Sequence, residues 1–272
     1  MVSRRRALEV NRKRWDSLVP IHLRSRFYGV EEFKAGKSSL HPVELEEVGD
    51  VSGKDLLHLQ CHFGMDTLSW ARLGANVTGV DFSKEAIRTA SALSKELDLR
   101  ARFVCSNVYD LPRRLKGTFD IVYTSYGVLC WLPDLDRWGR IIARYLRPGG
   151  SFHLIDDHPF ARMLSEKATR PAMRSPPQYS TEGTPLKFVV QGSYADGGSS
   201  LKMTEYEWLH PLSEVVNSLA RAGLRIEFLH EFAFEGWQEF PWLSKGRDGY
   251  WRPKDPRVNV PLMFSLKATL PA

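Results

Sequence analysis

Short apolar runs alternate with longer amphipathic stretches through the middle of the chain. The apolar runs lie between polar or glycine-containing turns and predict strands over residues 54–59, 76–81, 101–105, 119–123 and 151–156. The stretches between them have apolar residues at helical spacing and predict helices over residues 66–73, 83–97 and 134–146. Strands and helices that alternate in this way are typical of an α/β fold with a doubly wound, mostly parallel sheet.

The pattern is different before this region. Residues 7–19 have apolar positions at helical spacing, and we expect a helix that ends at Pro20, because proline lacks a backbone donor. Residues 42–48 predict another short helix. We therefore expect an N-terminal helical cap over residues 1–40, followed by one α/β domain over residues 41–272.

The pattern changes again after residue 158. Alternating polar and apolar residues at 188–194 and 201–208 flank an Asp-Gly-Gly-Ser turn and predict a hairpin within an inserted segment, residues 159–210. A helix over residues 213–222 and two further strands, over residues 224–232 and 260–268, follow. The inserted segment and the aromatic N-terminal residues are the candidate lids over a binding site.

Composition and charge narrow the class of protein. The 272 residues are 43% hydrophobic and 26% charged, as in ordinary globular proteins, and no apolar run reaches the roughly 18 residues of a membrane span. The three cysteines form no CxxC pair or Cys/His cluster, so we expect a reduced, cytoplasmic protein with no metal site. The net charge of +6 fits an anionic small-molecule substrate, and no membrane or nucleic-acid partner is expected.

Candidate binding residues follow the first two strands of the predicted sheet, at the edge where such sheets bind ligands. Gly64, in the turn after the first strand, could let the backbone approach a ligand, although the G-x-G-x-x-G motif is absent and a plain turn remains an alternative. Asp81 ends the second strand, where its carboxylate could accept hydrogen bonds from both hydroxyls of a ribose or could simply begin the next helix. Phe82 could lie against an adenine ring.

Candidate residues also follow the later strands. Asn107 could bind the edge of an adenine or could form an Asx turn, and Ser125 and Tyr126 would face the acceptor, with Tyr126 as an aromatic wall for a cation. His158, after the fifth strand, is a candidate general base because the ordinary pKa of histidine is near 6.5, or else a turn residue. His62 is a second candidate base, or else a residue that caps a helix or packs in the core.

These motifs, taken in order, resemble those of the class I S-adenosylmethionine (SAM)-dependent methyltransferases. The matching segments are residues 56–64, 80–83, 107–112, 119–122 and 146–150. The resemblance is strong over residues 40–158, and the two late strands resemble the antiparallel final pair of that family. It implies a seven-stranded, Rossmann-like sheet with an antiparallel last strand, SAM as the cofactor and S-adenosylhomocysteine as the product.

The resemblance also implies roles for individual residues. Gly64 and the backbone from Gln60 would hold the methionine part of SAM. Asp81 would hold the ribose, and Phe82, Asn107 and Val108 would enclose the adenine. Many members carry glycines where this chain has Gln60 and His62, so two bulky side chains would narrow the turn and could reach the carboxylate of the ligand. The predicted cofactor-binding residues are Gln60, His62, Gly64, Asp81, Phe82, Asn107, Val108 and Ser125; the predicted catalytic residues are His158 and Tyr126.

The expected activity is methyl transfer from SAM to a small-molecule acceptor, more probable on nitrogen or oxygen than on carbon. Three alternatives stay open at this point. A SAM-using cyclase or lyase would release methylthioadenosine, and a non-catalytic protein would bind SAM without turnover. An NAD-dependent oxidoreductase is disfavoured because G-x-G-x-x-G is missing.

Overall fold

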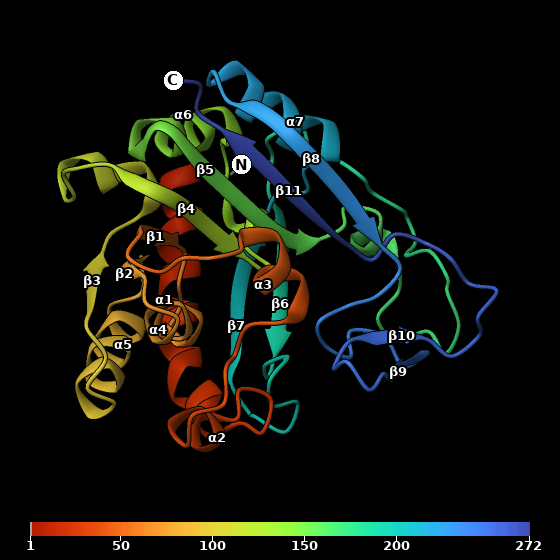
Figure 1. Ribbon diagram of the computed structural model, residues 1–272. Coiled ribbons are helices and arrows are strands. Elements are labelled where there is room, and N and C mark those ends of the chain that lie inside the picture. Colours follow the sequence, from red (N-terminus) through yellow and green to blue (C-terminus); the bar gives the residue numbers. More distant parts are fainter. Residues whose placement is uncertain (1) are drawn as a thin grey trace.

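The central feature of the computed structural model, which describes residues 2–272, is a seven-stranded sheet with the order β3-β2-β1-β4-β5-β11-β8 (Figure 1). β11 pairs antiparallel with β5 and β8, and the other neighbouring strands pair in parallel. The strands are β1 Asp55–Leu59, β2 Asn76–Asp81, β3 Ala101–Cys105, β4 Phe119–Ser125, β5 Leu146–Asp157, β8 Arg225–Phe232 and β11 Met263–Thr269. The predicted doubly wound, mostly parallel sheet with one antiparallel strand is confirmed.

Helices cover both faces of this sheet. Successive strand residues point to opposite sides, and apolar residues on both sides have to be buried. Leu57 of β1 packs in the core beneath α6 and α7, whereas its neighbour Leu56 packs in the core that contains Trp70 of α4. Both leucines are fully buried, as expected for a strand that helices cover on both sides. The helices are α1 Arg4–Arg24, α2 Val30–Lys34, α3 Pro42–Val48, α4 Met65–Arg72, α5 Lys84–Glu96, α6 Leu135–Tyr145 and α7 Leu212–Arg221, with 3₁₀ turns η1 Val108–Arg113, η2 Leu129–Trp131 and η3 Ala161–Met163.

The predicted end of the first helix at Pro20 is wrong, because α1 continues through the proline to Arg24. An interior proline removes one helical hydrogen bond and crowds the preceding turn. Val19 on one side of Pro20 and His22 on the other are fully buried. The packing of this last turn against the domain therefore outweighs the local cost of the proline.

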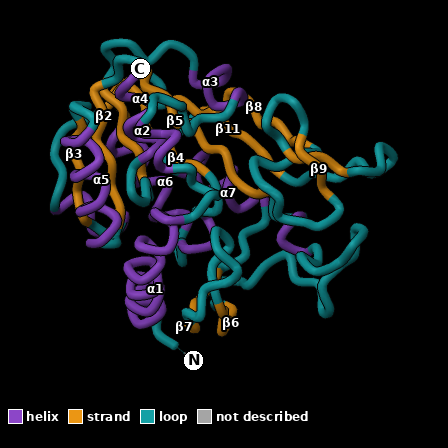
Figure 2. Tube along the Cα trace, turned by 90° about the horizontal axis from the view of Figure 1, so that it is seen from below, coloured by secondary structure: helices purple, strands orange, loops and turns teal. Residues whose placement is uncertain are grey.

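Two hairpins extend from the main sheet. β6, Leu186–Gln191, pairs antiparallel with β7, Lys202–Glu207, which confirms the predicted hairpin, and α1 packs along β7. Figure 2 shows α1 and this hairpin projecting together from the body of the molecule. The second hairpin, β9 Leu243–Lys245 with β10 Trp251–Pro253, was not predicted because its strands are only three residues long.

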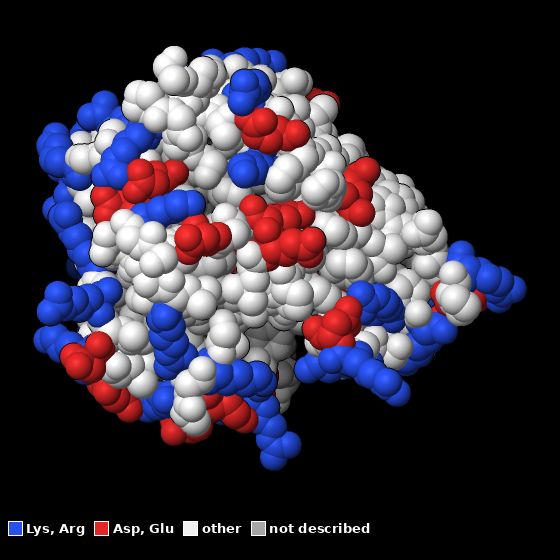
Figure 3. Space-filling model, in the orientation of Figure 1, with Lys and Arg blue, Asp and Glu red and all other residues white. Residues whose placement is uncertain are grey.

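Charged side chains are spread over the surface. On the face seen in Figure 3, basic side chains follow the edge that β3 and α5 form, and acidic side chains lie nearer the centre. On this face the positive charges do not form one continuous patch. Among the described residues, no helix combines the length and apolar character needed to cross a lipid bilayer.

Candidate functional site

The loop that follows β1 has an unusual backbone. Gln60 and His62 adopt left-handed conformations, with φ of 58° and 49°, and Gly64 follows with φ of 82°. Side chains other than glycine rarely occupy this region, and such strain gathers at functional sites. The two bulky residues therefore keep the tight, left-handed turn instead of straightening it.

Gly64 is needed for packing inside the protein. A Cβ atom at this position would lie 2.8 Å from the ring of Phe103 on β3 and 2.9 Å from Cβ of Ala90 on α5. Both distances are shorter than real carbon contacts allow. This glycine lets the β1 loop lie directly on the second βα unit, which is a packing role in addition to any approach to a ligand.

Asp81 lies at the carboxyl end of β2 and receives hydrogen bonds from two loops. The backbone N–H of Ser83 donates to its Oδ1 at 2.8 Å, and the N–H of His62 donates to its Oδ2 at 3.0 Å. Burial raises the pKa of Asp81 to about 6. The position is the one predicted for a ribose-binding carboxylate, and the two donors fix the orientation of the carboxylate.

Two buried polar atoms beside Asp81 have no partner within the described protein. Gln60 donates from Nε2 to the carbonyl of Val128 at 3.0 Å, which leaves its Oε1 without a partner. His62 places Nε2 2.8 Å from Nδ1 of His22, which leaves its own Nδ1 without a partner. Buried polar atoms are nearly always satisfied, so this pair fits a polar ligand such as the amino acid part of SAM.

Helix α1 closes over this loop. The ring of Trp15 meets the rings of His62 and Trp131 edge-on, with centroids 5.1 Å and 5.5 Å apart. Asp16 accepts a hydrogen bond from the hydroxyl of Ser83 at 2.7 Å. Burial lowers the pKa of His22, about two turns further along α1 than Trp15, to about 3, so His22 and the adjacent His62 form a neutral hydrogen-bonded pair.

The residues predicted to bind adenine lie only partly where the sequence placed them. Asn107 uses Oδ1 to accept from the N–H of Tyr109 at 2.9 Å, which is the Asx alternative, and the side chain of Val108 is buried in the core. Phe82 and Asn107 nevertheless line a pocket of about 510 Å³, whose other wall includes Arg12 of α1. The structure therefore brings Phe82 and Asn107 to one pocket, and Val108 is not among the residues that line it.

A hydrogen-bonded cluster follows β4. Ser125 donates to Asp66 at 3.3 Å, and the hydroxyl of Tyr126 donates to Glu44 at 3.0 Å. Glu44 is fully buried and also accepts from Tyr123, and burial raises its pKa to about 8. No sequence signal marked Glu44, because it lies on the short helix α3, outside the βα repeat.

The region predicted to face the acceptor lies beyond β4 and β5. Asp156 accepts from the backbone N–H of Leu129 at 3.0 Å, and together with Asp157 it lines a small pocket. His158 lies elsewhere, with its Nδ1 accepting from the N–H of Phe160 at 3.0 Å and its Nε2 2.7 Å from Glu231 of β8. The structure thus brings the two aspartates to the pocket but directs His158 toward the sheet edge.

Comparisons with known proteins agree with this geometry. Residues 57–154 match the family described as a methyltransferase domain. A ubiquinone biosynthesis O-methyltransferase from Xanthomonas oryzae pv. oryzae is 32% identical over 135 residues, which are 48% of this chain and 56% of the relative. The chain spans about half the length of the curated relatives it matches.

Solved structures extend the likeness to most of the fold. An S-adenosylmethionine-dependent methyltransferase from Mesorhizobium loti superposes with a TM-score of 0.58 at 19% identity and covers 87% of this chain and 99% of its own. One from Methanosarcina mazei gives 0.55 at 17% identity, over 85% and 98%. Residues 57–154 of this chain therefore match a methyltransferase domain, and its seven-stranded sheet has the fold of these solved SAM-dependent methyltransferases.

Proposed function

We propose that this protein transfers the methyl group of SAM to a nitrogen or oxygen atom of a small-molecule acceptor. The observation that carries the proposal is the mouth of β1 and β2, where the fixed carboxylate of Asp81 lies beside two unpartnered buried atoms, Gln60 Oε1 and His62 Nδ1. This arrangement offers acceptors to a sugar diol and to an ammonium group at the same time.

The proposed cofactor site divides into three parts. Asp81 binds the ribose hydroxyls through charge-assisted hydrogen bonds, and Phe82 with Asn107 encloses the adenine in the large pocket. Gln60 and His62 bind the methionine part. Their side chains replace the contacts that a glycine-lined turn would make. Ser125 and Tyr126 follow β4 and face the reacting end of the cofactor.

The protein contributes mainly by positioning. SAM supplies a methyl group already activated on a sulfonium, so the chain has to hold a nucleophile in line with it. Such positioning lowers barriers by roughly 7–11 kcal/mol in favourable cases. His158 is not proposed as a general base, because both its ring nitrogens face groups outside the pocket.

We infer a small acceptor because other parts of the chain cover the proposed binding site. We infer that α1, within the N-terminal cap at residues 1–40, and the inserted segment at residues 159–210 act as one lid. Asn11 of α1 exchanges two hydrogen bonds with the backbone of Tyr206, at 2.7 Å and 2.8 Å, and Arg14 forms a buried ion pair with Glu205. A lid of this kind excludes water from a reaction that takes place beneath it.

Two measurements test the proposal. Calorimetry with SAM and with S-adenosylhomocysteine should detect binding of one molecule per chain. Incubation with SAM and a panel of small phenols and amines should then release S-adenosylhomocysteine only when a suitable acceptor is present. Release of methylthioadenosine would assign the protein to the cyclases or lyases, and absence of binding to either compound would refute the proposal.

A further inference from the structure

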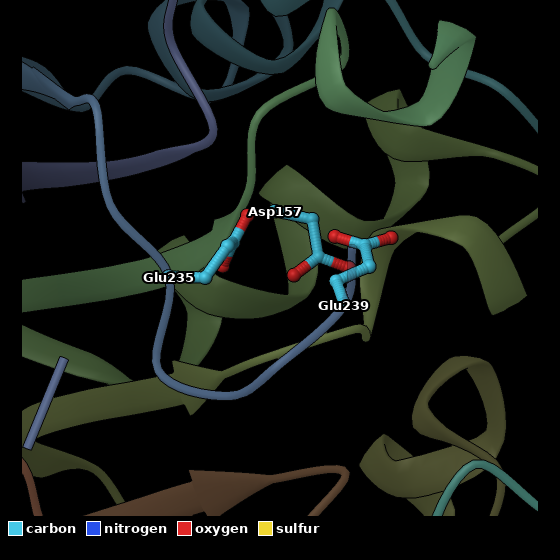
Figure 4. A group of neighbouring side chains, drawn as sticks. All are labelled: Asp157, Glu235 and Glu239. Atoms are coloured by element: carbon cyan, nitrogen blue, oxygen red, sulfur yellow. The ribbon is translucent and has the colours of Figure 1, made fainter. Parts of the chain in front are cut away.

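Three carboxylates meet at the acceptor end of the sheet. Asp157 is the last residue of β5, and Glu235 and Glu239 lie in the loop between β8 and β9. One oxygen from each residue lies within 4.8 Å of the other two. Figure 4 shows the three side chains pointing toward one another from these separate segments. The fold therefore holds three acidic groups together although 82 residues of sequence separate the first from the last (239 minus 157).

The cluster is buried and lacks hydrogen-bond donors. Glu235 is fully buried, and neither of its carboxylate oxygens has a partner in the described protein. Asp157 Oδ1 and Glu239 Oε2 are buried and unpartnered as well. A buried carboxylate without a partner costs several kcal/mol, so this arrangement indicates a ligand that supplies positive charge.

The nearest cationic side chain does not fill this role. Arg162 forms an ion pair with Glu207, and its guanidinium lies 3.8 Å from the Oδ2 of Asp157. It thus approaches one edge of the cluster, and the opposite oxygen of Asp157 remains free. Burial raises the pKa of all three acids, to about 7 for Glu239, and repulsion from the other carboxylates of the cluster adds to the rise at Asp157 and Glu235.

We propose that Asp157, Glu235 and Glu239 form a binding site for one divalent cation. Carboxylate oxygens are the ligands that Mg²⁺, Mn²⁺ and Ca²⁺ prefer. Adjacent ligand oxygens of such an ion lie about 3–3.5 Å apart and opposite ones about 4–5 Å apart. Three oxygens that all lie within 4.8 Å of one another can therefore reach a single ion. Backbone hydrogen bonds between Glu235 and Trp251, at 2.8 Å and 2.9 Å, hold the loop that carries two of the ligands.

The site adjoins the acceptor pocket, because Asp157 also lines that pocket. Three protein ligands leave half or more of the coordination positions of such an ion to water or to oxygen atoms of another molecule. The cation would thus sit where it can orient an oxygen-bearing acceptor. The binding itself does not depend on the proposed methyl transfer, so the two can be tested separately.

Manganese binding gives the direct test. Metal-free protein is titrated with Mn²⁺, and free Mn²⁺ is measured by electron paramagnetic resonance. We expect one ion bound per chain, displaced by excess Mg²⁺ or Ca²⁺, with affinity at least tenfold weaker in Glu235→Gln and in Glu239→Gln. Glu166→Gln is the matched control: this exposed acid pairs with Arg174, contributes charge near Glu239, and is not a ligand, so its variant should bind normally.

A thermal melt without added metal separates lost binding from lost folding. Glutamine keeps the shape of the side chain without a carboxyl group that burial must protonate, so Glu235→Gln should melt no lower than the wild type while losing the stabilisation that Mn²⁺ confers on the wild type. Absence of Mn²⁺ binding at millimolar concentration, or unchanged binding in both glutamine variants, would overturn the proposal. Stabilisation by methylammonium but not by Mn²⁺ would also overturn it and would assign the cluster to an organic cation.

Discussion

The two ends of the binding edge are built in different ways. At the cofactor end, the proposed ligand-binding groups lie within a few residues of a strand terminus. The backbone N–H groups of Ser83, in the loop after β2, and of His62, in the loop after β1, hold Asp81 in place. At the acceptor end, the polar groups come from distant segments, as with Glu44 against Tyr126 and with Asp157 against Glu235. Local βα turns thus set the geometry of the first end, and the tertiary packing of distant segments sets that of the second.

The difference also concerns charge. The acid at the cofactor end is satisfied by backbone donors, whose positions the βα turns fix. The acids at the acceptor end crowd one another, and burial raises their pKa. The proposed cofactor end thus offers a fixed carboxylate to hydroxyl groups, whereas burial at the proposed acceptor end favours binding of a proton or a cation.

The largest effect is expected from Gly64→Ala, which tests whether the cofactor loop is held by close packing. The added Cβ would overlap Phe103 and Ala90, and the residue would keep an unfavourable positive φ. We expect a loss of about 2–4 kcal/mol in the free energy of unfolding, measured by urea denaturation. Gly36→Ala is the control, because its φ of 107° is also positive but nothing lies within 4 Å of its Cβ. Equal losses in the two variants would contradict the packing role.

The second prediction concerns Asp81→Asn, which tests the ribose site. The variant removes the negative charge and places an amide N–H₂ group opposite a backbone N–H that now donates to Asp81. The affinity for S-adenosylhomocysteine should therefore fall by about 1.5–3 kcal/mol, roughly 10- to 150-fold. Calorimetry measures the affinity. Asp136→Asn on the exposed surface of α6 should leave it unchanged. Wild-type affinity in Asp81→Asn would remove this residue from the site.

The sequence predicted the positions of residues after β1 and β2 better than the contacts after β4 and β5, for a physical reason. Strand tips and their turns are local, so the position of Asp81 follows from the alternation of strands and helices. The meeting of Asp157 with Glu235 depends on how β11 and β8 bring a distant loop back to β5, which no spacing reveals. The continuation of α1 past Pro20 was missed for the same reason, because tertiary packing decides it.

The third prediction uses pH to examine the acceptor end. The pKa of Glu44 is about 8 in the folded protein against an ordinary value of 4.5, so folding takes up a proton between these values. Its contribution to stability is full below pH 4.5 and is lost as the pH rises through 8. Between pH 6.5 and 8.5 the wild type should therefore lose about 2 kcal/mol more than Glu44→Gln, at about 1.4 kcal/mol per pH unit for one proton.

Buried histidines contribute equally to both proteins. His22, His58 and His153 have pKa values near 3 in the folded protein, so their stabilising contribution grows until the pH is about one unit above the ordinary value of 6.5, and it cancels when the wild type is compared with Glu44→Gln. Chemical denaturation at several pH values measures both proteins. Parallel curves for the wild type and Glu44→Gln would show that Glu44 is ionised in the folded protein.

The smallest effect should come from Asn11→Ala, which tests whether the lid links the two ends. The variant loses both hydrogen bonds to the backbone of Tyr206 but leaves the residues at the proposed cofactor site unchanged. We expect S-adenosylhomocysteine to dissociate about 3- to 10-fold faster, equivalent to about 1 kcal/mol, because a looser α1 releases the loop beneath Trp15 more often. Stopped-flow fluorescence measures the rate, and Lys13→Ala on the exposed side of α1 is the control. If both variants release the ligand at the wild-type rate, α1 is a fixed part of the domain and the hairpin does not control access to the cofactor.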